Sequence, residues 1–212
     1  MTKCFRYLFQ ANLVNYPMAV GFGAVIIAGC YLTGVPADGR GLFYGYFNMF
    51  PSMLLLVALF SGTALCTSSL NHALSYGARR EDYFWGLQGI MVLNTLVYTL
   101  MNAGFLALPS LLGWNTDFQG AKLALTYPLS MFMVHAVGCA LGRLYTKSQK
   151  LAMVINAIAI FLLILNPIFD TIVTHNAGHW GDLPWLLLLA SLLIAFVCEF
   201  WTYCVIKTAT VR

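Results

Sequence analysis

Charged residues are scarce in this chain of 212 residues. It contains 11 Lys and Arg and 7 Asp and Glu, so that only 8% of its positions are charged. Ordinary soluble domains have about 25% charged residues, because their surface faces water. The composition therefore excludes an ordinary soluble fold and indicates a protein whose surface faces lipid.

The apolar runs are long, as in Trp185–Val197. Strands of a membrane barrel alternate polar and apolar residues, so these runs favour helices. A helix needs about 20 apolar residues to cross the hydrocarbon core of a bilayer. We predict an all-α, polytopic single domain over residues 1–212. Its six transmembrane helices are expected at about 17–35, 50–70, 84–110, 124–145, 150–172 and 184–207.

The chain also lacks the motifs of several protein classes. No Gly-x-x-x-x-Gly-Lys phosphate loop is present, and the remaining connections are too short for a soluble catalytic domain, so we predict no enzyme activity in this chain. The six cysteines lie mostly within apolar spans and are interpreted as buried apolar residues rather than a disulfide framework. His175 and His179 are separated by Gly178, which disfavours the helix a zinc pair would need, so no metal is expected.

The basic residues are distributed unequally between the predicted connections. Only Arg40 and Lys122 fall on one side. The nine on the other side are Lys3, Arg6, Arg79, Arg80, Arg143, Lys147, Lys150, Lys207 and Arg212. Basic residues accumulate in cytoplasmic connections, so both termini are predicted to be cytoplasmic. Because these residues are spread over short loops rather than gathered in one patch, we expect no nucleic-acid partner.

Residues 1–16 precede the first span. Phe5, Leu8, Asn12 and Tyr16 recur at helical spacing, which predicts an amphipathic helix at the cytoplasmic membrane surface. A basic leader ahead of the first span explains the same residues equally well.

The connection between the second and third spans has an unusual sequence. Leu70, Ala73, Leu74 and Gly77 share one helical face, which predicts a short surface helix. Two arginines, two acidic residues and an aromatic trio follow at 79–85. These residues alone fit a docking segment, and they fit equally a solvated loop with aromatic membrane anchors.

Leu74-Ser75-Tyr76-Gly77-Ala78-Arg79, followed by Tyr83-Phe84, resembles a motif of small bacterial ABC transporter permeases of the type-2 (type V exporter) class. Residues 140–145 resemble it more weakly. The resemblance extends to the whole plan of the chain, from the N-terminal interfacial helix to the six spans and cytoplasmic termini.

The resemblance implies a specific role for residues 71–83. They would form a coupling helix that docks in a groove of a separate ABC ATPase subunit, which would hold the ATP and Mg, so that no cofactor is expected in this chain. The coupling residues would be Leu74, Ser75, Tyr76, Gly77, Arg79, Arg80, Glu81 and Asp82. The resemblance also implies a homodimer or heterodimer of permease subunits in the bacterial inner membrane, and it implies an exporter function.

Two other functions remain open at this stage. A substrate-binding membrane subunit of a vitamin importer has a similar size and span number, and would hold a ligand when purified. A non-transport membrane assembly or immunity protein would have no ATPase partner. An intramembrane protease is disfavoured, because the spans contain no Glu-Glu, His-x-x-x-Asn or Gly-x-Ser-Gly arrangement.

A few polar residues interrupt the apolar spans. Asn94, Asn102 and Glu199 are candidates for a substrate path, although the asparagines fit interhelical bonding equally and Glu199 fits a structural polar pair. His135 is interpreted as a hydrogen-bonded packing residue. The pair Gly138 and Gly142 has the spacing that lets two helices approach closely.

Overall fold

The computed structural model describes residues 2–32, 42–111, 120–175 and 183–208. These residues form helices and turns, with no strand among them, which confirms the all-α fold. The helices in chain order are α1 (Thr2–Asn12), α2 (Asn15–Leu32), α3 (Leu42–Ala64), the π-helix η1 (Leu65–Ser69), α4 (Leu70–Ser75), α5 (Arg80–Leu111), α6 (Gly120–Lys147), α7 (Gln149–His175) and α8 (Leu183–Lys207). The six long helices α2, α3, α5, α6, α7 and α8 overlap the six predicted ranges. The largest difference is in α3, which begins at Leu42 rather than at about 50 and ends at Ala64, where η1 follows.

Four helical stretches within the described residues are long and apolar enough to cross a membrane. They are Lys3–Gly29, Phe50–Ser75, Arg80–Phe105 and Leu189–Lys207. Gln149–Leu162 of α7 is a shorter apolar helix. The chain therefore has the features of a multi-pass membrane protein, while six spans remain a prediction.

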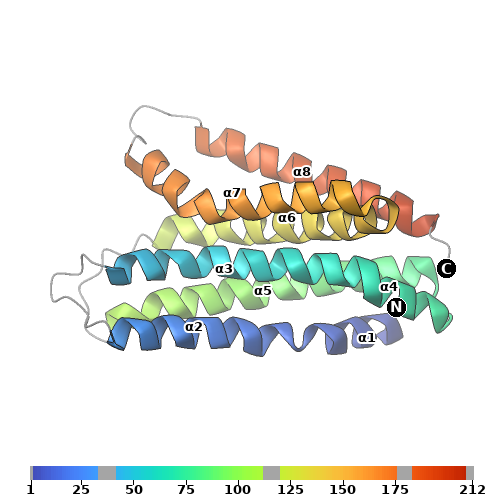
Figure 1. The fold of residues 1–212 in the computed structure, drawn as a ribbon, viewed down its shortest axis with the longest axis horizontal. Helices are drawn as coiled ribbons and strands as arrows, with labels where there is room; N and C mark the ends of the chain where they lie inside the picture. The colour runs from blue at the N-terminus through green and yellow to red at the C-terminus, as the bar shows by residue number, and fades with distance from the viewer. Residues whose placement is uncertain (1, 33–41, 112–119, 176–182, 209–212) are drawn as a thin grey trace.

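The long helices run side by side along one axis (Figure 1). The first residues of α1, the last of α8, the turn 76–79 and the break between α6 and α7 all lie at the same end of the bundle, which we call the terminal end (Figure 1). The described helices that carry the predicted cytoplasmic basic residues thus have their basic ends together, where the predicted six spans would also place them.

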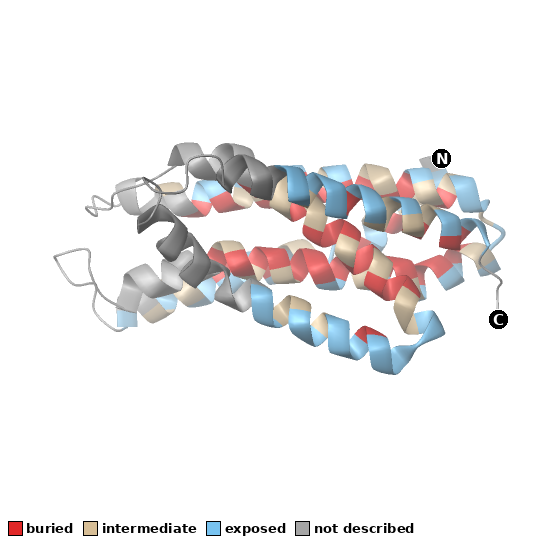
Figure 2. Cartoon of the chain, turned by 90° about the horizontal axis from the view of Figure 1, so that it is seen from above, coloured by how far each residue is buried: buried red, intermediate tan, exposed pale blue. Residues whose placement is uncertain are grey.

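Helices α3 and α6 pack most closely, in the centre of the bundle, where the buried residues concentrate (Figure 2). A Cβ on Gly142 would lie 2.5 Å from the Thr63 carbonyl oxygen, and one on Gly138 would collide with the Leu59 carbonyl oxygen. On the other helix, a Cβ on Gly62 would lie 2.5 Å from the His135 carbonyl oxygen. The close approach expected from Gly138 and Gly142 is therefore confirmed, and α3 is the partner helix.

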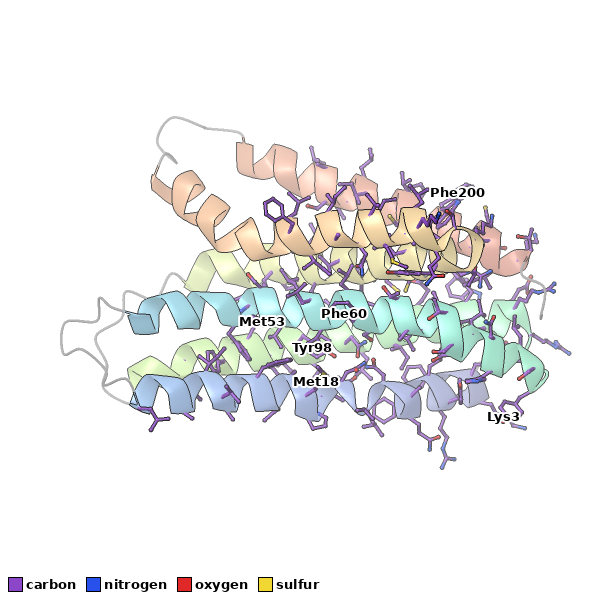
Figure 3. All side chains as sticks on the ribbon, viewed as in Figure 1. Lys3, Met18, Met53, Phe60, Tyr98 and Phe200 are labelled. Atoms are coloured by element: carbon purple, nitrogen blue, oxygen red, sulfur yellow. The ribbon has the colours of Figure 1, made fainter. Side chains whose placement is uncertain are left out.

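Helix α1 continues the line of α2 and runs along α5 (Figure 1). Leu8 on its apolar face is fully buried, and Gly86 and Gly89 of α5 leave room for Phe5. Lys3 lies at the terminal end (Figure 3). The apolar face of α1 thus packs against protein, and its position at a membrane surface stays a prediction.

The outer faces of α7 and α8 are apolar and exposed. Their exposed side chains include Leu151, Val154, Ile158, Leu192, Phe196 and Phe200. Phe200 of α8 is labelled in Figure 3. Apolar patches of this extent are unusual on proteins surrounded by water. Contact with lipid hydrocarbon explains them.

Candidate functional site

The segment that resembles a permease motif forms a tight turn between two helices at the terminal end. Helix α4 ends at Ser75, and Gly77 has a φ of 80°. The Ala78 amide donates to the Ala73 carbonyl oxygen at 3.0 Å, and the Gly77 amide donates to the Leu74 carbonyl oxygen at 3.0 Å. This is the Schellman arrangement that closes a helix, and its left-handed position favours glycine.

Helix α5 begins directly after this turn. The Tyr83 amide donates to the Arg79 carbonyl oxygen at 2.9 Å, and Glu81 and Asp82 occupy the first turn of the helix. Acidic side chains there stabilise the positive end of the helix dipole. The predicted segment 71–83 therefore comprises most of α4, the turn 76–79 and the first residues of α5.

The side chains of this segment divide between the core and the surface. Ala73 is buried and Leu74 is partly buried against the core, whereas Tyr76 is 85% exposed. The exposed group also includes Ser75, Gly77, Arg79, Arg80 and Glu81, and Asp82 is partly exposed. The turn thus presents an aromatic ring and several charges on a fixed backbone.

A second polar site lies where the α1–α2 junction meets α3, α5 and α6. Its members are Asn12, Asn15, Tyr16, Ser61, Asn94 and His135. We call it the buried polar cluster. Asn12, Asn94 and His135 are at most 1% exposed. Polar groups at this depth need partners within the protein, because lipid supplies none.

Asn94 of α5 is the centre of the cluster. Its Oδ1 accepts hydrogen bonds from Asn12 Nδ2 at 2.6 Å and from the Tyr16 hydroxyl at 2.7 Å. The Asn12 Oδ1 in turn accepts from the Ser61 hydroxyl at 2.6 Å and from Asn15 Nδ2 at 2.7 Å. These hydrogen bonds tie two other helices, α3 through Ser61 and α5 through Asn94, to the α1–α2 junction.

His135 of α6 completes the cluster at its far side. Because Asn94 Oδ1 accepts two hydrogen bonds, its Nδ2 faces His135 Nε2, at the long distance of 3.5 Å. Which of the two groups donates in this contact depends on the imidazole tautomer. The other ring nitrogen, Nδ1, is buried without a hydrogen-bond partner. The interpretation of His135 as a polar packing residue agrees with this contact.

The three predicted substrate-path residues do not form one group in this structure. Asn102 is 2% exposed, and its Oδ1 has no hydrogen-bond partner. Glu199 of α8 accepts a hydrogen bond from Gln88 of α5 through Oε2, and its Oε1 has no partner. No described hydrogen bond joins Asn94, Asn102 and Glu199, so a shared role in a substrate path stays a prediction.

The contributions of Asn12, Tyr16 and Ser61 were not predicted from the sequence. A signal was available, because Asn12 and Tyr16 fall on the apolar face shared with Leu8. A polar residue on such a face indicates an interhelical partner. The partner is Asn94, which is distant in sequence, so that only the folded structure identifies it.

The described cysteines Cys4, Cys66, Cys139, Cys198 and Cys204 are free thiols. Among the described residues no three His, Cys, Asp or Glu side chains are placed to hold a metal ion. His179 lies outside the described residues, so the expectation for the His175–His179 pair is not examined by the structure.

Comparison with known proteins gives no relative: no protein family, no curated protein and no solved structure matches the chain. The resemblance to ABC permeases therefore rests on the residues at 74–84 and on the plan of the chain.

Proposed function

We propose that this chain is the membrane subunit of an ATP-driven exporter, in which a separate ABC ATPase hydrolyses ATP and drives substrate movement through a dimer of permease chains. The proposal takes the chain to have six spans in a bacterial inner membrane, with cytoplasmic termini. Substrate would pass between the helices as the bundle alternates between inward-open and outward-facing forms.

The observation that supports this proposal most is the turn 76–79. It lies within the permease-like motif, exposes Tyr76 and Arg79 beside the exposed Arg80 of α5, and is at the terminal end of the bundle (Figure 1). The Schellman hydrogen bonds keep the turn in one conformation. A partner that docks on a preorganised turn loses less conformational entropy than one that must order a loop.

The topology leads to a labelling prediction. Single cysteines introduced as Tyr76→Cys or Ser148→Cys in a cysteine-free chain are expected to react with a membrane-impermeant reagent only after the membrane is opened. The reason is the unequal distribution of basic residues, which places both positions in the cytoplasm. Ready labelling in intact cells would contradict this orientation, and opened membranes provide the control.

The ATPase partner leads to a second prediction. Arg79→Glu is expected to reduce co-purification of an ABC ATPase subunit at least about tenfold while membrane insertion stays unchanged. Reversing one charge at a docking surface costs about 1.4 kcal/mol or more when its partner is desolvated. The measurement is ATPase co-purification and nucleotide turnover in the same mild detergent.

Lys150→Glu is the matched control. Lys150 is also exposed, begins a helix at the same end of the bundle, and lacks the motif. We expect it to leave the complex intact. Equal effects of the two reversals, or a chain that purifies alone as a stable species, would remove the support for an exporter subunit.

A further inference from the structure

We propose that the π-helix η1 is a hinge in the helix that leads to the turn 76–79, and that the Tyr83 hydroxyl holds this hinge in its π form. Its functional consequence rests on the proposed function, because the turn is where the ATPase would dock. The hinge itself is a property of this chain alone.

Helix α3, η1 and α4 form one continuous helical stretch. The residues flanking η1, Ala64 and Leu70, have ordinary α-helical backbone angles. A π-helix bonds residue i to i+5 instead of i+4, so one extra residue is inserted at this point. Short π segments inside α-helices are uncommon and frequently occur at functional sites.

Side-chain hydroxyls bind the carbonyl oxygens at the start of the π segment. Thr67 Oγ1 donates to the Thr63 carbonyl oxygen at 2.9 Å and contacts that of Ala64 at 3.3 Å. Ser68 Oγ donates to the Ala64 carbonyl oxygen at 3.3 Å. The next carbonyl oxygen, that of Leu65, accepts from the Tyr83 hydroxyl.

The hydrogen bond from the Tyr83 hydroxyl joins α5 to η1, the two segments on either side of α4 and the turn. Tyr83 is fully buried one turn into α5, and its hydroxyl reaches back across the α4–α5 hairpin to Leu65, the first residue of η1. A displacement of the turn 76–79 would therefore move η1 through α4, and it would move Tyr83 through the start of α5. Ser61 of the buried polar cluster lies one helical turn before Leu65, so the hinge separates the cluster from the turn.

Helix α6 packs closely against one side of η1. A Cβ on Gly142 of α6 would lie 3.0 Å from the Cys66 Cβ. Conversion of η1 to α-helical register would shift the residues after it by about 1.5 Å along the axis and by about 100° around it. Helix α4 and the turn would move as a unit, whereas α3 before Ser61 would stay packed on α6.

The test is amide hydrogen exchange of the purified full-length protein in detergent, with Tyr83→Phe compared with the unchanged chain. Losing the hydroxyl removes one hydrogen bond but keeps the ring, so we expect about fivefold faster exchange over residues 65–79. Residues 50–61 are expected to keep their exchange rates. Thr67→Val provides a second variant with the same expected direction, because Thr67 is only partly buried and its replacement leaves the core intact.

Tyr127→Phe is the matched control. The Tyr127 hydroxyl likewise donates to a backbone carbonyl oxygen, that of Pro51 in α3, at 3.2 Å, but it lies far from η1 in the chain. Its loss is expected to leave residues 65–79 unchanged. Unchanged exchange at 65–79 in both Tyr83→Phe and Thr67→Val would overturn the hinge, as would faster exchange confined to 65–69. Neither result depends on an ATPase partner, so the hinge and the exporter function are tested separately.

Discussion

Replacing Gly138 with leucine is expected to prevent the chain from forming a stable bundle. A Cβ at this position would collide with the Leu59 carbonyl oxygen, which belongs to the backbone of α3 and cannot rotate away. Overpacked cores lose about 1–3 kcal/mol per substitution, and a backbone collision belongs at the upper end or beyond. The measurement is the yield of monodisperse protein and its thermal midpoint in detergent.

Gly21→Leu is the control for this substitution. Gly21 lies on the exposed face of α2, and a Cβ there would meet nothing within 4 Å. It makes the same glycine-to-leucine change inside a long helix, so the intrinsic helix propensity and the side-chain hydropathy change alike. If both variants lose stability equally, the close packing of α3 on α6 does not hold the bundle together.

The substitution Asn94→Leu is expected to weaken the packing of helices α1 and α2 against the rest of the bundle. It leaves Asn12 Nδ2, the Tyr16 hydroxyl and His135 without their described partner. Hydrogen bonds between membrane helices average about 0.6 kcal/mol, but buried groups that lose every partner cost about 1–3 kcal/mol each. We expect a total loss of about 2 kcal/mol or more in a detergent unfolding titration, and faster tryptic cleavage at Arg6.

Asn156→Leu is the matched control in α7. The Asn156 Oδ1 is buried and already has no hydrogen-bond partner, so its removal is expected to be neutral or stabilising. A loss of stability from Asn156→Leu as large as that from Asn94→Leu would mean that any asparagine replacement disturbs this chain, and that the buried polar cluster has no special role.

The approximate position of each long helix could be predicted from the sequence, although α3 begins eight residues before the expected position 50. Apolar runs of about 20 residues separated by short polar connections leave helices as the only regular structure that satisfies the backbone in lipid. The basic residues also predict which connections share one end of the bundle, because residues such as Arg79 and Lys147 fall in every second connection, whereas the side of the membrane that this end faces stays a prediction. In the structure, both lie at the terminal end, beside the two termini.

The partners of the polar residues could not be predicted in this way. Asn12 and Asn94 are 82 residues apart and form one hydrogen bond, whereas Asn94 and Asn102 lie on the same helix and form none between them. Helical periodicity shows which residues share a face of one helix, and it contains no information about which helix lies opposite.

The sequence by itself determined that this chain is helical and apolar, where its helices lie, and that Gly138 and Gly142 allow a close neighbour, because these properties depend on residues near one another in the chain. Only the tertiary structure decided that α3 is that neighbour and that Asn12 of α1 is hydrogen-bonded to Asn94 of α5. It also decided that η1 interrupts the helix leading to the turn 76–79. The physical reason is that each of these features depends on the rotation of a helix about its axis and on its shift along that axis relative to its neighbours. Contacts over the whole bundle set both.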